Sequence, residues 1–238
     1  MNIALVGYGT MNSLVAKKIE ESKDLDCVGI VDIGYYKSLD EIKNSFDAII
    51  DYSYPGNLDM IYDYVSRTHT PVVIATTGHT DEQINKIHEL SKVAPVVFTG
   101  NFSLGITVME KVLRDIAPIL KDKFDIEVIE KHHNKKVDAP SGTAKMLVRA
   151  LNPDHEYEEV YGRSGFKKRE HEIGVSAIRG GTIAGEHTVL FAGEDEVLEI
   201  THEAHSKLIF VNGTITAVRF IINKPYGLYN MNNILFNE

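Results

Sequence analysis

The spacing of apolar and polar positions changes along this chain and predicts which segments are strands and which are helices. In the first hundred residues, apolar runs of strand length, rich in β-branched residues, alternate with stretches of helical periodicity. The predicted strands are NIALVG, DCVGIVD, FDAIIDYS, TPVVIAT and APVVFTG, and the helical stretches include SLVAKKIEES and DEQINKIHELSK. This order predicts a parallel sheet with helices on both faces.

The pattern changes after residue 101. SLGITVMEKVLRDIAPIL predicts a long helix, and FDIEVIEKHH predicts a strand after it. Between Ile173 and Ala204, alternating apolar positions predict antiparallel strands with glycine-rich or acidic turns, in IGVSAIRGG, EHTVLFAG and EVLEITHEA. The polar stretch 154–168 is expected to be a mobile loop. KLIFVNGTITAVRFII predicts a last helix before a short tail.

Composition narrows the class of protein. With 238 residues, 43% of them hydrophobic, the chain can bury a full core. We expect a soluble, cytoplasmic protein, because no window approaches the roughly 18 apolar residues of a membrane helix and the N-terminus lacks the order of a secretion signal. A net charge of -9 disfavours nucleic acid as a partner. We also expect no membrane partner. The single cysteine, Cys27, is expected to be buried and inert.

A glycine turn follows the first predicted strand. ALVGYGTMN places Gly7 and Gly9 before a helix, where a pyrophosphate can approach the backbone. The position of a third glycine holds Asn12, so the motif alone is weak. The second strand, however, ends at Asp32, at the distance where an acid accepts hydrogen bonds from a ribose. This order favours a dinucleotide site over a plain tight turn, and two more strand ends, ATTG and TGNFS, are expected on the same edge.

The densest chemical cluster is EKHHNKKVDAPSGTAKML, from Glu130 to Leu147. A helix start at Ser141 attracts a carboxylate or phosphate, and Lys135 or Lys136 adds positive charge. Like-charge repulsion favours a neutral histidine here, and a bound anion favours its protonated form, which suits proton delivery. The histidines, the lysines and the helix start each fit a structural role when taken alone, but their combination in one short segment favours a functional site.

No metal is expected in this cluster, because no acidic or cysteine partner stands at ligand spacing on the same element. For most of the scattered histidines a structural role is expected: His155, His171, His187, His202 and His205.

These motifs resemble the dihydrodipicolinate reductase family, also called 4-hydroxy-tetrahydrodipicolinate reductase. HHNKKVDAPSGTA is similar to the family pattern H-H-x-x-K followed by D-A-P-S-G-T. Further similar segments cover nearly the whole chain: GYGTMN, ATTGHT, GNFSLG, IRGGTIAGEHTVLFAGEDEVLEITHEAHSK and GLYNMNNIL. The resemblance implies an oxidoreductase that reduces 4-hydroxy-tetrahydrodipicolinate to tetrahydrodipicolinate with NADH or NADPH in diaminopimelate and lysine biosynthesis, a branch of amino-acid biosynthesis.

The resemblance also implies the fold, which is α/β: a Rossmann-like doubly wound parallel sheet with an inserted α+β substrate and oligomerisation domain. The dinucleotide-binding domain is expected over residues 1–103 and 206–238. The inserted substrate-binding and tetramerisation domain is expected over residues 104–205, with antiparallel strands that assemble a homotetramer. The implied partner is a small-molecule dicarboxylate substrate.

Roles for single residues follow from the resemblance. His132 matches the family's proton donor or acceptor, and Lys136 matches its second proton donor. Substrate-binding positions are matched by His133, Gly142 and Thr143. Cofactor contacts are implied for Gly7, Tyr8, Gly9, Thr10, Met11, Asn12, Asp32, Ala75, Thr76, Thr77, Thr99, Gly100, Asn101 and Phe102.

The chain departs from the family pattern near the cofactor. The glycine turn lacks the arginine that many members carry, and Asp32 is followed by Ile33 rather than a basic residue. An acid there favours NADH, because it repels the 2′-phosphate of NADPH. Lys37 could compensate as a point charge, and Tyr35 or Tyr36 could stack on adenine. Both cofactors are therefore expected to work, NADH at least comparably.

Two other functions are weighed against this one. An amino-acid dehydrogenase that shares only the first domain would leave H-H-x-x-K and S-G-T without a use. A non-catalytic nucleotide-sensing regulator is disfavoured by the acidic charge and by the lack of a recognisable DNA-reading helix.

Overall fold

The computed structural model describes residues 1–237 and folds into two compact units. Unit 1 comprises Met1–Leu104 and the residues from Leu208 onward, and unit 2 comprises Gly105–Lys207. Unit 2 is therefore inserted between two segments of unit 1. Glu238, the last residue of the expected dinucleotide-binding domain, lies outside the described residues.

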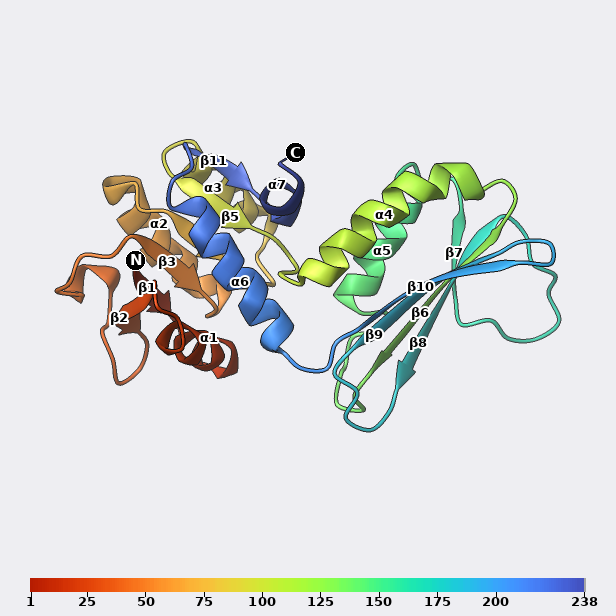
Figure 1. Cartoon of the computed structure of the whole chain (residues 1–238), viewed down its shortest axis with the longest axis horizontal. Coiled ribbons are helices and arrows are strands. Elements are labelled where there is room, and N and C mark those ends of the chain that lie inside the picture. The colour runs from red at the N-terminus through yellow and green to blue at the C-terminus, as the bar shows by residue number, and fades with distance from the viewer. Residues whose placement is uncertain (238) are drawn as a thin grey trace. The chain divides into compact units, whose positions relative to one another are not determined.

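Unit 1 is built on a six-stranded parallel sheet in the order β11-β5-β4-β3-β1-β2 (Figure 1). The strands are β1 (Asn2–Val6), β2 (Asp26–Val31), β3 (Ala48–Asp51), β4 (Val72–Ile74), β5 (Pro95–Phe98) and β11 (Gly227–Tyr229). The chain places β2 on one side of β1 and β3 on the other, so the strand order reverses between β1 and β3. Doubly wound sheets bind ligands at such a reversal, on the carboxyl edge.

Helices cover both faces of this sheet, because alternate residues of each strand face opposite sides. Ile3 and Leu5 of β1 share a core with α1, α6 and α7, whereas Ala4 and Val6 share a core with α2 and α3. These helices span α1 (Thr10–Glu20), α2 (Leu58–Thr68), α3 (Asp81–Ser91), α6 (Leu208–Ile221) and α7 (Met231–Phe236); short 3₁₀ turns, η1 (Leu39–Glu41) and η2 (Pro55–Asn57), lie in the loops. The expected Rossmann-like fold is confirmed.

Unit 2 packs two helices, α4 (Leu104–Leu120) and α5 (Gly142–Leu151), on one face of a five-stranded sheet (Figure 1). The sheet order is β10-β9-β6-β8-β7. Its strands are β6 (Asp125–His132), β7 (Glu158–Tyr161), β8 (Glu172–Arg179), β9 (Glu186–Ala192) and β10 (Val197–Glu203). None of the described helices is long and apolar enough to cross a membrane.

The prediction of antiparallel strands from Ile173 to Ala204 is wrong for the first of them. β8 pairs in parallel with β6 and β7, and β6 lies between β8 and β9. Only β9 and β10 form the expected antiparallel pair. Alternation reports which face of a strand is buried but not the direction of its neighbour, and here α5 and β7 provide the long connection that a parallel β6–β8 pair needs.

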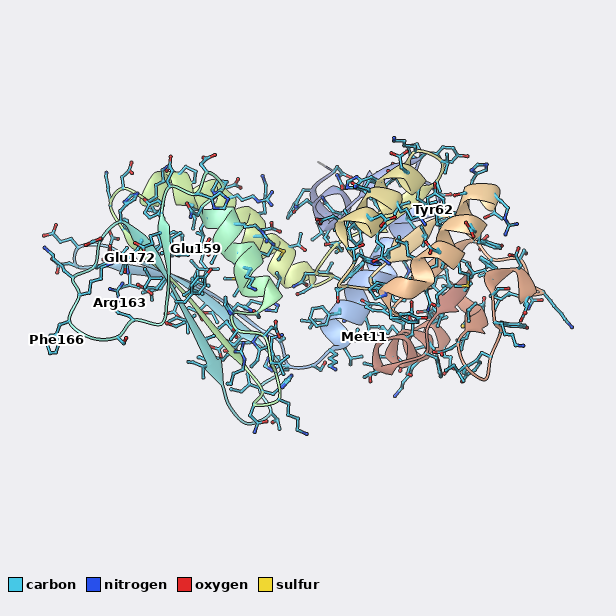
Figure 2. The ribbon with its side chains drawn as sticks, turned by 180° about the vertical axis from the view of Figure 1, so that it is seen from behind. Met11, Tyr62, Glu159, Arg163, Phe166 and Glu172 are labelled. Atoms are coloured by element: carbon cyan, nitrogen blue, oxygen red, sulfur yellow. The ribbon has the colours of Figure 1, made fainter. Side chains whose placement is uncertain are left out.

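The stretch 154–168, predicted as a loop, contains β7 and begins the long connection to β8. Figure 2 shows Arg163 and Phe166 on this connection. Arg163 pairs with the buried carboxylate of Glu172 at the start of β8, whereas Phe166 is fully exposed. One end of the connection is thus attached to the sheet by an ion pair.

Candidate active site

The glycine turn of unit 1 fits tightly against the end of β3. Gly7 has φ +82°, a left-handed conformation that favours glycine. A Cβ on Gly7 would lie 2.8 Å from both the Tyr52 carbonyl oxygen and the Ser53 Cβ. The turn therefore requires glycine at position 7 for its conformation and for space.

The helix start that follows this turn is open. Gly9 is the N-cap of α1, no side chain caps the helix, and a Cβ on Gly9 would meet nothing within 4 Å. The first residues of α1, Thr10 and Met11, follow directly, and Figure 2 marks Met11. Tyr8, between the glycines, stands edge-on to Tyr35 at 5.1 Å. An uncapped, accessible helix N-terminus fits the pyrophosphate of a dinucleotide.

Asn12 supports the turn from inside the unit. The side chain is fully buried, and its amide donates to the carbonyl oxygens of Val6 and Gly7 at 2.7 Å each. The residue at the position of the third glycine thus shapes the turn through its side chain.

Asp32 follows β2 on the same carboxyl edge. Its carboxylate accepts the N–H of Tyr8 and, at 2.6 Å, the N–H of Ile33. These contacts fix the carboxylate beside the glycine turn, and each oxygen retains a lone pair for a ribose hydroxyl. Lys37, five residues on, is exposed, and its backbone N–H donates to Glu41 at 3.0 Å.

The loop after β4 carries three of the predicted cofactor residues. Ala75 and Thr76 are buried, and Thr77 is exposed. The Thr76 hydroxyl accepts the N–H of Ser53 at 2.8 Å, which ties this loop to the one after β3.

The loop after β5 carries the other four. Thr99 and Gly100 lie at its surface, and the Thr99 hydroxyl donates to the Asn101 carbonyl oxygen at 3.2 Å. Asn101 is buried, and its side-chain oxygen accepts the N–H of Ser103 at 2.8 Å. Phe102 belongs to the core, with its ring 6.2 Å from that of Tyr52. The predicted cofactor residues of unit 1 therefore follow the ends of four strands of one sheet, β1, β2, β4 and β5.

In unit 2, the predicted proton donor ends a strand whose inner face changes from apolar to charged. Ile126, Val128, Glu130 and His132 share the buried face of β6 because side chains alternate along a strand. The first two join the apolar core under α4 and α5. Glu130 is fully buried and His132 is 8% exposed, so a carboxylate stands on the core face two residues before the histidine.

Both oxygens of Glu130 are engaged. Oε2 lies 2.6 Å from Nδ1 of His132, and Oε1 accepts the N–H of Ser141 at 3.0 Å. Arg179, the register partner of His132 on β8, donates to Oε2 and Oε1 at 2.8 and 2.7 Å. Burial acts to raise the pKa of Glu130, but the hydrogen bonds from Arg179, His132 and Ser141 outweigh it and hold the pKa below its usual value. Glu130 is therefore ionised at neutral pH.

His187 on β9 is the register partner of Glu130 and joins this cluster. Its Nε2 lies 3.0 Å from the Ser141 hydroxyl, and its ring stands edge-on to His132 with centroids 5.1 Å apart. Burial lowers the pKa of His187 to about 4, and the neighbouring His132 acts in the same direction. The hydroxyl of Ser141 accepts the N–H of Ala144 at 3.1 Å and also hydrogen-bonds to the neutral His187, whose tautomer decides which of the two groups donates.

The start of α5 lies beside these residues. Ser141 is its N-cap, and a Cβ on Gly142 would meet nothing within 4 Å. The backbone N–H groups of Gly142 and Thr143 stand in the first turn of the helix, the position that favours an anion. The predicted helix start at Ser141 is confirmed.

The loop between β6 and α5 holds the remaining predicted residues. His133 is partly buried, and its Nδ1 has no hydrogen-bond partner within residues 1–237. Lys136 pairs with Asp138 at 2.8 Å, and this contact lowers the pKa of the Asp138 carboxyl. Arg179 donates to the Asp138 carbonyl oxygen, so the loop is tied to β8 as well.

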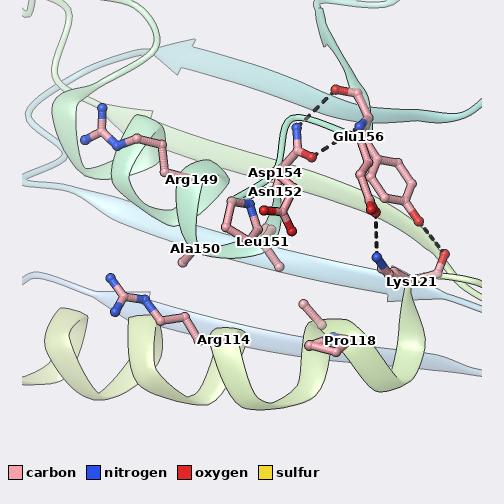
Figure 3. Close-up of a pocket in the computed structure, with 12 residues that line it drawn as sticks. Arg114, Pro118, Lys121, Arg149, Ala150, Leu151, Asn152, Asp154 and Glu156 are labelled. Carbon is pink, nitrogen blue, oxygen red and sulfur yellow. Dashed lines mark hydrogen bonds and ion pairs between the residues drawn. The ribbon is translucent and has the colours of Figure 1, made fainter.

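A pocket of about 520 Å³ lies elsewhere in unit 2, between the C-terminal halves of α4 and α5 (Figure 3). Arg114 and Arg149 stand at one end, and an ion pair between Lys121 and Glu156 at 2.5 Å stands at the other. The pocket contains no histidine and none of the predicted site residues. We therefore place the candidate active site at the His132 cluster.

No group of three or more His, Cys, Asp or Glu side chains within the described part of the chain is arranged to hold a metal ion. Glu130 and Arg179 were given no role from the sequence, and His187 was placed among the scattered histidines, for most of which a structural role was expected. A signal for Glu130 exists, because a charged residue interrupts the apolar alternation of β6 on the face that His132 shares. The contacts of Arg179 and His187 depend on strand register, which their own segments do not reveal.

Comparison with known families covers almost the whole chain. The family described as "Dihydrodipicolinate reductase, N-terminus" matches residues 1–102, and "Dihydrodipicolinate reductase, C-terminus" matches residues 105–235. A 4-hydroxy-tetrahydrodipicolinate reductase of Staphylococcus aureus (strain MRSA252) is 43% identical over 245 residues, which cover 98% of this chain and 100% of the relative. One of Clostridium novyi (strain NT) is 39% identical over 238 residues, with 95% and 94% covered.

Solved structures show the same fold. "Dipicolinate bound Dihydrodipicolinate reductase from Paenisporosarcina sp. TG-14" superposes with a TM-score of 0.80 at 22% identity, over 99% of each chain. A myo-inositol dehydrogenase from Corynebacterium glutamicum superposes with a TM-score of 0.62 at 16% identity, over 95% of this chain and 90% of the other.

Proposed function

This chain belongs to the dihydrodipicolinate reductase family, and we propose that His132 and Lys136 supply the protons of the family's reaction. The protein is an NAD(P)H-dependent oxidoreductase that converts 4-hydroxy-tetrahydrodipicolinate to tetrahydrodipicolinate in diaminopimelate and lysine biosynthesis. Water leaves the 4-hydroxy substrate, C4 receives a hydride, and one proton completes the reduction.

The observation that best supports these roles is the environment of His132. Its Nδ1 lies 2.6 Å from an ionised, fully buried carboxylate, so the opposite nitrogen is the one available for proton transfer. A Cβ on Gly185 would lie 3.1 Å from that Nε2, and only a glycine leaves this space open. A histidine oriented in this way beside a helix start that favours an anion suits general acid catalysis on an anionic substrate.

Each protein group has a task in the proposed mechanism. The reduced nicotinamide, when bound, supplies the hydride. The first-turn N–H groups of Gly142 and Thr143 receive one substrate carboxylate, and His133 contributes to holding the substrate. His132 delivers a proton from Nε2. Lys136 leaves its ion pair with Asp138 and acts as the second proton donor, to the departing 4-hydroxyl. The carbon next to C4 loses one proton as water leaves, so the reaction consumes one proton overall.

We infer that unit 1 is the dinucleotide-binding domain and that unit 2 binds substrate and forms a homotetramer. The glycine turn, the open start of α1 and the position of Asp32 support the first assignment. The His132 cluster and the apolar side chains exposed on the unit 2 sheet, such as Ile178 and Val197, support the second. The protein is proposed to work in the cytoplasm on a small dicarboxylate, without a nucleic-acid or membrane partner.

The test is a coupled assay that follows the loss of nicotinamide absorbance with His132→Gln. Turnover is expected to fall about 10²–10⁴-fold while the fold survives. His88→Gln, an exposed histidine on α3, is the matched control and should retain parental turnover. His133→Gln should raise KM more than it lowers kcat. A folded His132→Gln variant with parental turnover would exclude the proposed acid.

A second experiment tests the carboxylate site. The Paenisporosarcina enzyme was solved with dipicolinate bound, and we expect dipicolinate to inhibit this protein competitively against its substrate. Its carboxylate should lie at the N–H groups of Gly142 and Thr143 in crystals. A complex with the inhibitor away from this turn would reject the anion site.

A further inference from the structure

We propose that Glu130, held by Arg179, is the positioning residue of this active site: its Oε2 fixes the tautomer and orientation of His132, and its Oε1 fixes the turn that receives the substrate carboxylate. The inference rests on the proposed role of His132 as the proton donor. Glu130 does not touch substrate in this scheme and acts only through its neighbours.

The position of Glu130 calls for such a role. The residues before it on the same face of β6, Ile126 and Val128, belong to the apolar core. An apolar side chain at position 130 would continue that core, whereas a buried carboxylate has a desolvation cost that its partners must offset. Arg179 provides a bidentate partner of opposite charge. The remaining bonds of the carboxylate go to His132 and Ser141, both parts of the site.

The carboxylate determines which nitrogen of His132 carries hydrogen. An ionised oxygen 2.6 Å from Nδ1 can only accept, so Nδ1 is the donor in both the neutral and the protonated ring. The neutral ring therefore presents Nε2 as its basic atom, and the protonated ring presents an Nε2 hydrogen for delivery. Carboxylates that bind the far nitrogen of a functional histidine act in the same way in other sites.

One carboxylate also links two parts of the site that act on different ends of a substrate. Oε1 accepts the N–H of Ser141, the residue directly before the predicted substrate-binding positions. Arg179 in addition donates to the Asp138 carbonyl oxygen in the loop that carries Lys136. The Arg179–Glu130 pair thus sets the distance between the proton donor and the start of α5.

The test is Glu130→Gln, which keeps the shape of the side chain. Its carbonyl oxygen can still accept the Ser141 N–H and one Arg179 N–H, whereas its NH₂ group replaces the Oε2 that faced His132 and the other Arg179 N–H. That second Arg179 bond is lost, and Nδ1 of His132 must become an acceptor. We expect kcat to fall about 10²-fold, with KM for substrate changed by no more than about threefold. A ¹⁵N spectrum of histidine-labelled protein, assigned by comparison with His132→Gln, should show the Nδ1–H tautomer in the parent and the Nε2–H tautomer in the variant.

The matched control is Glu127→Gln on the opposite face of β6. Glu127 also pairs with an arginine, Arg169, but makes no contact with His132, so its variant should keep the parental kcat and the parental His132 tautomer. The double variant Glu130→Gln with His132→Gln should be no slower than His132→Gln alone, because the glutamine retains the Ser141 bond and the contact that it loses acts through His132.

The outcomes separate this inference from the proposed function. Parental turnover in His132→Gln would reject the acid itself. A large loss in His132→Gln together with parental kcat in Glu130→Gln would reject only the positioning role. If Glu130→Gln does not fold, the ¹⁵N spectrum of the parent protein provides the test, because it reports the tautomer of neutral His132. A predominant Nε2–H form would overturn the proposal.

Discussion

At the scale of single residues, His187 links acid pH to the stability of unit 2. The folded protein holds the pKa of His187 at about 4, first because it is buried and second because His132 is near; His202 and Lys136 act in the same direction and Glu130 opposes them. In the unfolded chain the pKa is about 6.5. As the pH falls below 6.5, His187 becomes protonated in the unfolded chain but stays neutral in the folded protein. The free energy of unfolding therefore decreases until the pH reaches about 4.

We predict that titration of His187 lowers the free energy of unfolding by about 3 kcal/mol between pH 6.5 and pH 4, at about 1.4 kcal/mol for each pH unit. About 2 kcal/mol of this loss is expected by pH 5. His187→Gln retains a side chain that can hydrogen-bond to the Ser141 hydroxyl, and it cannot take up a proton. Denaturant unfolding at pH 7 and pH 5 should show a smaller loss in the variant than in the parent. Equal losses in the two proteins would show that His187 does not titrate in this range.

The choice of nicotinamide is also decided by single residues. The Asp32 carboxylate is fixed beside the glycine turn and can accept ribose hydroxyls, but it repels a 2′-phosphate. Lys37 is exposed and can reach a phosphate as a point charge. We predict that kcat/KM with NADH is at least comparable to that with NADPH, and that Lys37→Ala shifts the ratio further toward NADH. A parental preference for NADPH above about tenfold, or about 1.4 kcal/mol, would contradict this prediction.

Most residues of the candidate site were predictable because they are neighbours in the sequence. His132, Lys136 and Ser141 lie within ten positions, and a strand end followed by a helix start keeps them together. The contacts of Glu130 with Arg179 and His187 were not predictable, because they join β6 to β8 and β9 and depend on which strands pair and in which register.

At the scale of elements, α6 packs closely against the loop after β5 at Gly213. A Cβ on Gly213 of α6 would lie 1.7 Å from the carbonyl oxygen of Phe102, a backbone atom that cannot move alone. In an isolated helix Gly→Ala adds about 1 kcal/mol of stability, so any loss must come from this contact. We predict that Gly213→Ala lowers the free energy of unfolding by about 1–3 kcal/mol.

Chemical denaturation measures this effect, and Asn212→Ala is the control. Asn212 is the exposed neighbour of Gly213 on the same helix, and its replacement should be neutral or slightly stabilising. A stable Gly213→Ala variant would mean that α6 and the loop can separate at little cost. The loop carries predicted cofactor residues, so the KM for nicotinamide should rise in Gly213→Ala and not in Asn212→Ala.

The direction of β8 shows where element patterns stop being informative. The alternation in this segment predicted a strand, and the structure buries Ile173 and Val175 on the face that the helices cover. The same pattern fits a parallel or an antiparallel neighbour. The decision lies in the connection through α5 and β7, whose length permits β8 to return beside β6 in parallel.

At the scale of the whole molecule, the sheet of unit 2 has one face that α4 and α5 cover and one that no described element of this unit packs against. Because Ile173 and Val175 face the helices, alternation directs Ile178 to the other face, where its side chain is 46% exposed. The described residues leave Val197 of β10 61% exposed as well. Exposed β-branched residues on a sheet face are typical of a surface that a second copy of the chain covers.

We therefore predict that light scattering gives about four times the chain mass of 26.6 kDa and that Ile178→Lys lowers it. A lysine on this face would have to be desolvated in the interface, which favours the separate subunits. Ile119→Lys is the matched control, because Ile119 is 72% exposed on α4, the helix that packs on the opposite face, and its variant should retain the parental mass. A parent that is monomeric at micromolar concentration would refute the tetramer. A tetrameric Ile178→Lys variant would place the interface on another surface.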